Sequence, residues 1–343
     1  MRAFYKEGFM LFKSEKPGPV FIAPHSTVSL LSISRGDVMS ELVTSRLVSK
    51  LGGIGVVSTV PRKGGYGIDY FREAATMEEA VSMFNAFESS DYDAMQEFEK
   101  KYSFFARDGE EYLEKMNAYN QFWTTIETLA PKKPFFVIIH TQAARMKNFP
   151  SLLDVATLSG RWIDERVAKE AVEKVCISNK KMINSLKDEL KKYSTYWAAI
   201  HLKSSILYRF KKFDINCLRG SIKTELINDI KRASSLLGKD YGTMMKDLIW
   251  EKYLEIIQEC IDNCDFAVTY QNTFDGRPGE KRIGRLLDKC GGSAISLETS
   301  AFLNEIYPKI SVKLVEDIIN YIVRKEKLKG FERFVKCDAK EMR

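Results

Sequence analysis

The chain has 343 residues, of which 45% are hydrophobic and 29% charged, and its net charge is +7. That composition is ordinary for a folded soluble protein and leaves room for one large domain or two smaller ones. The sequence contains no run of about 18 uncharged apolar residues, and its start, "MRAFYKEGFMLFKSEKPGP", lacks the apolar core of a signal peptide. We therefore expect a cytoplasmic protein that neither spans nor binds a membrane.

The positive charge favours anionic partners in general. It does not favour nucleic acid, because no dense block of Lys and Arg with interleaved aromatic residues is present. The six cysteines form no C-x-x-C pair, and Cys260 and Cys264, four residues apart, are interpreted as core residues. Histidines are scarce, so the position of each of the three is informative: His25, His140 and His201.

The first half of the chain predicts alternating strands and helices. Short apolar runs at 20–25 ("VFIAPH") and 54–60 ("IGVVSTV") are typical of buried strands, as is the proline-bounded segment 131–140 ("PKKPFFVIIH"). Between the first two runs, residues 37–53 have helical spacing with an Asp at the start and two glycines at the end. Charged, helical segments are predicted from 76 to 129.

The second half changes character and then returns to the same pattern. Residues 162–262 are long, charged and helical, and they predict a helical insertion or subdomain. Strands are predicted again at 265–271 ("DFAVTYQ") and 293–298 ("SAISLE"), separated by a loop, and an amphipathic helix is predicted at 311–325.

Short apolar strands that alternate with helices indicate an α/β fold. We expect three layers, with a mixed, mostly parallel sheet and helices on both faces. Residues 1–161 and 263–343 would form one α/β domain, and the helical insertion would interrupt it.

Polar residues stand at or just after the carboxyl ends of several predicted strands, where open α/β sheets bind their ligands. They are His25, Arg62, His140 and Glu298, together with a loop at 275–277. A lone histidine in such a place is more often a turn or structural residue than a ligand. Two of only three histidines, accompanied by an arginine and a carboxylate, make a functional site an equal alternative.

Such a group of side chains could support metal-assisted hydrolysis. Two imidazoles and one carboxylate hold Zn²⁺ and leave a fourth position for water. The ion acidifies that water and polarises a carbonyl group. A further glutamate can then serve as general base, and an arginine can stabilise an oxyanion or bind a substrate carboxylate.

Six short blocks follow one another in an order known from a family of hydrolases. The blocks are "APHS" (23–26), "SRGDVMSELVTSRLVSKLGG" (34–53), "VPRKGGYGIDYFR" (60–72), "VIIHTQ" (137–142), "DVATLSG" (154–160) and the closing segment 276–307. In these blocks the chain resembles the N-formylglutamate amidohydrolase family, which is related in fold to the zinc carboxypeptidases. The resemblance covers roughly 1–162 and 265–330.

The resemblance implies one Zn²⁺ ion held by His25, His140 and a carboxylate, for which Asp37 is the candidate. Asp37 could equally be the N-cap of the helix that follows it. The resemblance also implies that Glu298 is the general base and that Arg62 stabilises the oxyanion.

Three further residues are implied to bind or position an anionic, small-molecule or peptide-like substrate. Arg72 would bind its carboxylate, and Asp69 would orient one of the arginines. Arg277 could face the substrate from its basic loop, for which a solvated loop is an equal alternative.

The chain also departs from the family pattern. Phe71 stands where the family has Asn, Ile138 stands where an Asp often orients a ligand, and the spacing from Arg62 to Asp69 is longer. The helical insertion is a further difference. The substrate is therefore not expected to be N-formylglutamate itself.

Two hypotheses follow. In the first, the protein is a zinc-dependent amidohydrolase that cleaves an N-acyl or peptide-like amide of a small acidic substrate. In the second, it is a catalytically inactive descendant that binds a ligand or a protein, with the insertion as the interaction surface. The insertion could also join copies of the chain into a homo-oligomer.

Overall fold

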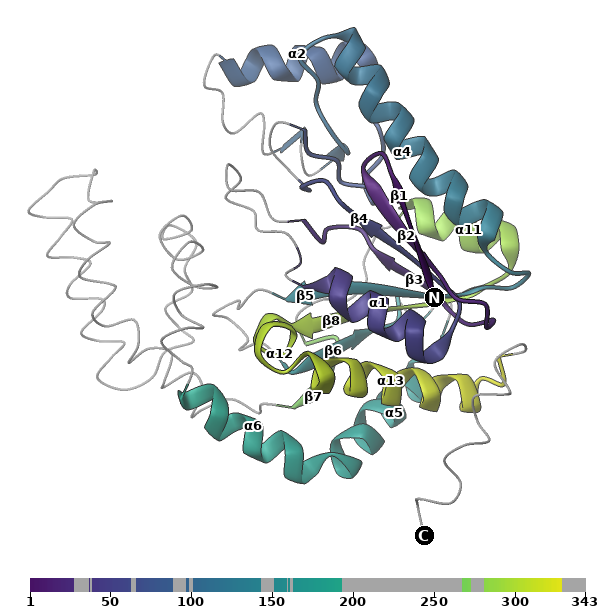
Figure 1. Ribbon diagram of the computed structural model, residues 1–343, viewed down its shortest axis with the longest axis vertical. Helices are drawn as coiled ribbons and strands as arrows, with labels where there is room; N and C mark the ends of the chain where they lie inside the picture. The colour runs from purple at the N-terminus through teal and green to yellow at the C-terminus, as the bar shows by residue number, and fades with distance from the viewer. Residues whose placement is uncertain are drawn as a thin grey trace, which may run out of the picture.

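A single eight-stranded sheet forms the centre of the molecule (Figure 1). The computed structural model describes residues 1–27, 37, 39–62, 66–88, 97–98, 101–142, 151–158, 160, 163–192, 267–272 and 281–328. Across the sheet the strands lie in the order β1 (Arg2–Lys6), β2 (Phe9–Lys13), β4 (Ile54–Ser58), β3 (Val20–Ala23), β5 (Phe135–Gln142), β8 (Ser293–Ser300), β6 (Leu153–Ala156) and β7 (Val268–Tyr270).

The four central strands, β4, β3, β5 and β8, are parallel to one another. On one side β1 and β2 form an antiparallel hairpin whose second strand pairs with β4. On the other side β6 runs antiparallel to β8, and β7 is parallel to β6. The sheet is therefore mixed and mostly parallel, as predicted.

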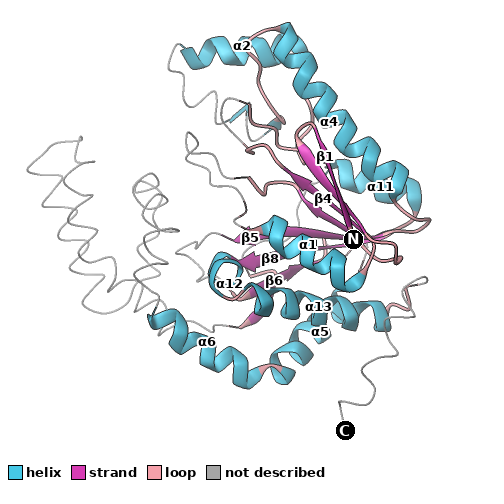
Figure 2. Cartoon of the chain, in the orientation of Figure 1, coloured by secondary structure: helices cyan, strands magenta, loops and turns pink. Residues whose placement is uncertain are grey.

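Helices cover both faces of this sheet, so the fold has three layers (Figure 2). One face carries α1 (Ser40–Leu51), α5 (Glu165–Ser178), α12 (Ala301–Ile306) and α13 (Pro308–Lys325). The other carries α4 (Gly109–Leu129) and α11 (Lys281–Cys290). Two further helices lie next to these: α2 (Met77–Glu88), which contacts α4, and α6 (Lys180–Lys192), which follows α5.

Strand β5 shows why the central strands read as continuous apolar runs. Phe136 and Ile138 pack into the core under α4 and α11, whereas Val137 and Ile139 pack into the core under α1 and α13. Because successive side chains of a strand point to opposite faces, a strand covered on both faces needs apolar residues at every position.

The predicted strands at 20–25, 54–60, 131–140, 265–271 and 293–298 are confirmed as β3, β4, β5, β7 and β8. The sequence analysis missed the β1–β2 hairpin and β6. All five residues of β1 are exposed, so this edge strand carries no apolar pattern. Strand β6 is only four residues long and includes a buried acid, Asp154.

The predicted loop between β7 and β8 is partly wrong, because helix α11 begins at Lys281. Of the predicted insertion, residues 162 and 193–262 lie outside the described residues. Its first helix, α5, packs against α13 and contributes Ala168, Ala171 and Val175 to the core of the sheet. Among the described helices, none is long and apolar enough to cross a bilayer.

A tight turn between α1 and β4 requires glycine at position 53. Gly53 has φ +80°, and an added Cβ would overlap the carbonyl oxygen of Pro19. The turn places β4 beside the start of β3, because Ile54 N donates to Pro19 O at 3.2 Å. We expect Gly53→Ala to lower the free energy of unfolding by at least about 2 kcal/mol, from left-handed strain plus the steric clash.

Gly291→Ala is the matched control. Gly291 also has a positive φ, +64°, but nothing lies within 4 Å of an added Cβ. Its alanine variant should lose only about 1 kcal/mol, the cost of the left-handed backbone alone. Urea unfolding of both variants measures the difference, and equal losses would show that the contact with Pro19 contributes nothing.

Candidate metal centre

The centre lies at the topological switch point of the sheet, beside the carboxyl end of β3. Strand β3 has β4 on one side and β5 on the other, and it is parallel to both. The chain leaves β3 through α1 on one face and enters β5 from α4 on the opposite face. At such a point the two connections separate beyond the carboxyl ends of the strands, which leaves room for a ligand.

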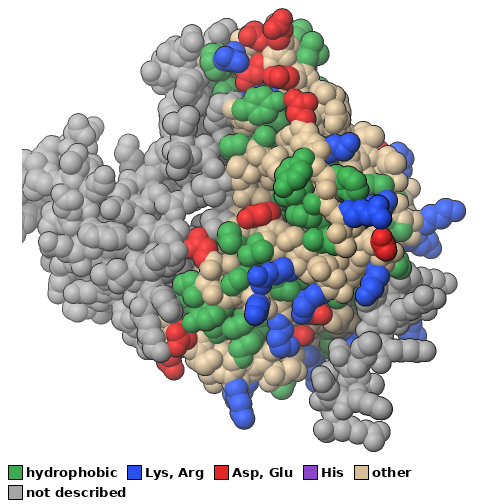
Figure 3. All heavy atoms as spheres, viewed as in Figure 1, with side chains coloured by type: hydrophobic (Ala, Val, Ile, Leu, Met, Phe, Trp, Pro, Cys, Tyr) green, Lys and Arg blue, Asp and Glu red, His purple; other side chains and the backbone are tan. Residues whose placement is uncertain are grey.

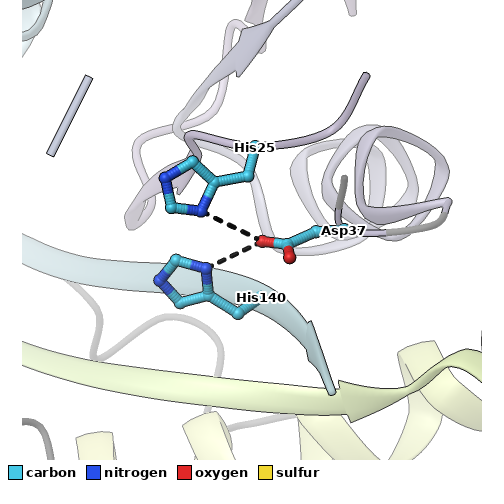
Figure 4. Close-up of side chains that lie close together, drawn as sticks. All are labelled: His25, Asp37 and His140. Atoms are coloured by element: carbon cyan, nitrogen blue, oxygen red, sulfur yellow. Dashed lines mark hydrogen bonds and ion pairs between the residues drawn. The ribbon is translucent and has the colours of Figure 1, made fainter. Parts of the chain in front are cut away.

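Three side chains converge there (Figure 4). His25 stands two residues after β3, His140 lies near the end of β5, and Asp37 lies just before α1. His140 Nδ1 is 2.8 Å from Asp37 Oδ2, and His25 Nδ1 is 3.5 Å from the same oxygen. All three ligand atoms lie within 4.8 Å of one another. Tetrahedral ligands about 2.1 Å from a zinc ion are about 3.4 Å apart. The distance from His25 to Asp37 already matches this spacing, whereas His140 and Asp37 would have to move slightly apart to admit the ion.

The backbone fixes Asp37 next to His25. Asp37 N donates to the carbonyl oxygen of His25 at 2.6 Å, and Asp37 O accepts from Ser40 N at 3.1 Å. The N-cap of α1 is Met39, with φ 58°, and it makes no side-chain cap hydrogen bond. The alternative interpretation of Asp37 as the N-cap is therefore wrong, and its carboxylate is directed to the histidines instead.

His25 has one ring nitrogen held and the other buried without a hydrogen bond. Nε2 donates to Asp69 Oδ1 at 2.9 Å, while Nδ1 makes no hydrogen bond and the side chain is 5% exposed. In neutral His25 the proton is on Nε2, so the lone pair of Nδ1 faces a carboxylate oxygen of Asp37. Two lone pairs repel unless a proton or a cation lies between them. This geometry fits a divalent metal ion bound through Nδ1.

Asp69 connects the histidine to the arginines. Its second oxygen, Oδ2, accepts from Arg62 Nε at 2.8 Å and lies 3.5 Å from Arg72 Nε. Burial raises the pKa of Asp69, but the charges of Arg62 and His25 outweigh it and hold the pKa well below its usual range. The carboxylate is thus ionised and accepts a hydrogen bond from His25 Nε2. A carboxylate that holds the other ring nitrogen of a metal-binding histidine is a frequent feature of metal sites.

Burial also raises the pKa of Asp37, and the charge and hydrogen bond of His140 reverse that effect, so the pKa is lowered overall. For Arg62, burial lowers the pKa, but the charges of Asp69, Asp37 and Glu298 outweigh this effect and raise the pKa above its usual value. The centre is therefore a compact set of mutually compensating charges. The two histidines are almost fully buried: His25 is 4% and His140 8% exposed, and no described histidine is visible on the face shown in Figure 3.

Glu298 lies beside His140 in the sheet. The two residues are register partners on β5 and β8, and Asp154 on β6 is the next partner in the same row. Partners in adjacent strands point to the same face, and the alternation along β5 and β8 places this row on the α4 and α11 side. The carboxylate of Glu298 is partly exposed and close enough to Arg62 to raise its pKa.

A buried hydrogen-bond network holds the backbone of His140 from the opposite face. Thr299 Oγ1 donates to His140 O at 2.8 Å, and Asn304 Nδ2 donates to Thr299 Oγ1 and to Thr141 Oγ1. Ser311 Oγ in turn donates to Asn304 Oδ1 at 2.6 Å. Helices α12 and α13 thereby fix the end of β5 on which His140 stands.

The structure brings together seven of the eight predicted site residues or places them in adjoining positions. His25, Asp37 and His140 form the candidate ligand set, Asp69 joins it to Arg62 and Arg72, and Glu298 adjoins His140. The eighth, Arg277, lies outside the described residues.

The sequence analysis missed the contact of Asp69 with His25. The family pattern has an orienting acid at position 138, where this chain has Ile138, a core residue under α4. The acid comes instead from a different segment 44 positions along the chain from His25. It also missed the support of His140 by Asn304, since an Asn in a short helix gives no signal of such a role.

No family model, curated protein or solved structure matches the chain. Fold and geometry together define an α/β protein with a mixed, mostly parallel sheet and a buried His–Asp–His group that could hold a divalent metal ion. That much of the resemblance to the amidohydrolase family is supported by the structure.

The segment that holds Asp69 is itself anchored by a buried ion pair on α4. Asp69 N donates to Ser103 O, and Ser103 Oγ donates to Asp69 O. Two residues further on, the carbonyl oxygen of Phe105 accepts from Lys115 Nζ at 2.8 Å. Lys115 is fully buried and pairs with Glu111 at 2.6 Å. The ion pair thereby stabilises the backbone on which Asp69 rests.

This arrangement predicts a pH-dependent contribution to stability. Burial raises the pKa of Glu111, but Lys115 and Arg107 outweigh it and lower the pKa below its usual value. A lowered pKa stabilises the fold above the unfolded value of about 4.3, and the stabilisation is lost as the pH falls through the folded value. Between about pH 6 and pH 3, the free energy of unfolding should fall less steeply in Glu111→Gln than in the unsubstituted protein.

The exposed neighbour Glu110 provides the control, since Glu110→Gln removes a carboxylate from the same helical turn. Its pH profile should parallel that of the unsubstituted protein. Parallel profiles for all three proteins would mean that the buried pair contributes nothing in acid.

Proposed function

We propose that the protein is a metal-dependent hydrolase that cleaves an N-acyl or peptide-like amide bond of a small acidic substrate. The observation that supports this most directly is the convergence of His25 Nδ1, His140 Nδ1 and Asp37 Oδ2 at the switch point of the sheet. Two imidazoles and a carboxylate, with a fourth position open, are a typical ligand set for catalytic Zn²⁺. The finer identity, a divergent relative of the N-formylglutamate amidohydrolases, rests on the sequence blocks.

The chain's own residues have distinct roles in this proposal. When bound, Zn²⁺ would lower the pKa of a water molecule and polarise the scissile carbonyl group. Glu298, beside His140, takes the proton from the attacking water and delivers it to the leaving amine. Arg62 has its Nε on Asp69, and its terminal nitrogens donate to the developing oxyanion.

Arg72 accounts for the acidic substrate. Its guanidinium lies 3.5 Å from Asp69 and is only about a quarter exposed, so it is held at the edge of the centre. A positive group placed this way suits a carboxylate on the substrate.

Metal analysis tests the ligand set. The purified protein should bind one Zn²⁺ per chain, and His25→Ala, His140→Ala and Asp37→Asn should each weaken binding by more than about 100-fold. Asp69→Asn should weaken it less, by about 10- to 100-fold, because it removes only the partner of His25 Nε2. Affinity is measured by competition with a chromophoric chelator.

The matched control is His201→Ala, which removes the third histidine of the chain. It should leave the Zn²⁺ stoichiometry and affinity unchanged. Unaltered metal content in His25→Ala and His140→Ala would refute the centre.

Activity is tested on a panel of N-acyl and dipeptide amides with and without an acidic side chain. Glu298→Gln should retain Zn²⁺ and lower kcat by about 100-fold or more, whereas Arg72→Ala should mainly raise KM for the acidic members. Stoichiometric Zn²⁺ without hydrolysis of any amide would instead favour the second hypothesis, a ligand-binding descendant of the fold.

A further inference from the structure

Phe71 makes ring contacts with both candidate histidines. Its ring centroid lies 6.1 Å from that of His25 and 5.8 Å from that of His140, and both pairs are T-shaped, with interplanar angles of 67° and 84°. The two imidazoles are 5.1 Å apart and inclined by 33°. Three rings thus form a triangle, and the edge-to-face geometry is one that aromatic rings prefer.

Phe71 is itself held in place. Its backbone N donates to Asp69 Oδ1 at 3.1 Å, the same oxygen that accepts from His25 Nε2. Its side chain is stacked on Trp123 of α4, with centroids 5.9 Å apart, and the residue is only 5% exposed. Trp123 is fully buried and donates Nε1 to the carbonyl oxygen of Tyr70. The ring cannot move without disturbing α4.

The two imidazole rings must be kept from rotating if both Nδ1 atoms are to bind the same metal ion. Both histidines point Nδ1 at Asp37, and each imidazole can rotate about its Cβ–Cγ bond. A rotation of either ring would carry Nδ1 away from the shared focus. For His25 the bond to Asp69 opposes this rotation at the far side of the ring, and the ring of Phe71 opposes it by packing.

We infer that Phe71 is a positioning residue that fixes the two imidazole rings in their metal-binding orientation. The inference deepens the proposed function and rests on it for the identity of the ligand. It also gives a role to Phe71, which stands where the amidohydrolase family that the chain resembles has Asn. Because the ring is apolar, its side of the centre offers the metal no protein ligand.

The test compares two identical substitutions in the same core. Phe71→Leu removes the ring contacts at the histidines, and Phe104→Leu removes a ring that packs on Tyr112 and Tyr119, away from them. Both positions are buried in the core under α4 and α11. Phe71→Leu should weaken Zn²⁺ binding by about 10- to 100-fold, as loss of a group that orients a ligand does, whereas Phe104→Leu should change it less than about 2-fold.

Two spectroscopic readouts separate positioning from general loss of stability. In the Co²⁺-loaded protein, the visible absorption of the ion should change in Phe71→Leu and not in Phe104→Leu. In the metal-free protein, the ring resonances of His25 and His140 in a ¹H–¹³C spectrum should shift and broaden only in Phe71→Leu. Equal effects of the two substitutions on both readouts would overturn the inference.

The metal-free spectrum also keeps the inference separate from the proposed function. If the unsubstituted protein binds neither Zn²⁺ nor Co²⁺, the proposed function fails and the histidine resonances alone decide. Sharp, unshifted resonances in Phe71→Leu would then overturn the positioning role, and selective broadening would support it.

Discussion

The carboxylate of Asp69 is the group on which the rest of the centre depends. It is 2% exposed, and it accepts hydrogen bonds from His25 Nε2, Arg62 Nε and the backbone N of Phe71. Burying an ionised carboxylate is costly unless charged and hydrogen-bonded partners surround it. Here every partner is also part of the candidate site, so the requirement that keeps Asp69 ionised also sets the tautomer of His25.

Asp69 is linked both to helix α4 and to the other residues of the centre. Outwards, the backbone of Asp69 is held by Ser103, and the segment after Ser103 is held by the buried Lys115 on α4. Inwards, the fixed tautomer leaves the lone pair of His25 Nδ1 directed at Asp37, an arrangement that a cation would stabilise. Of the ligand set only His140 lies within a strand. His25 and Asp37 stand on connecting segments, which the hydrogen bond from Asp37 N to His25 O and the contact of His25 with Asp69 hold together.

The two histidines are supported by contacts from both faces of the sheet. On the α4 side, Phe71 and Trp123 pack against the imidazole rings. On the α13 side, Thr299, Asn304 and Ser311 hold the backbone at His140 by hydrogen bonds. One layer thus sets ring orientation and the other sets the position of the strand end.

The sequence by itself determined the α/β class and five of the eight described strands, and it placed His25 and His140 at strand ends. It could do so because doubly covered strands are apolar at every position and the carboxyl ends of parallel strands meet at one edge. Asp37 entered only through the family resemblance, with a helix cap as an equal alternative. Only the tertiary structure decided that Asp37 is not a helix cap, that Asp69 holds His25, and that Phe71 contacts both imidazoles. These contacts join segments up to about a hundred residues apart, and their geometry is set by packing rather than by any local pattern in the chain.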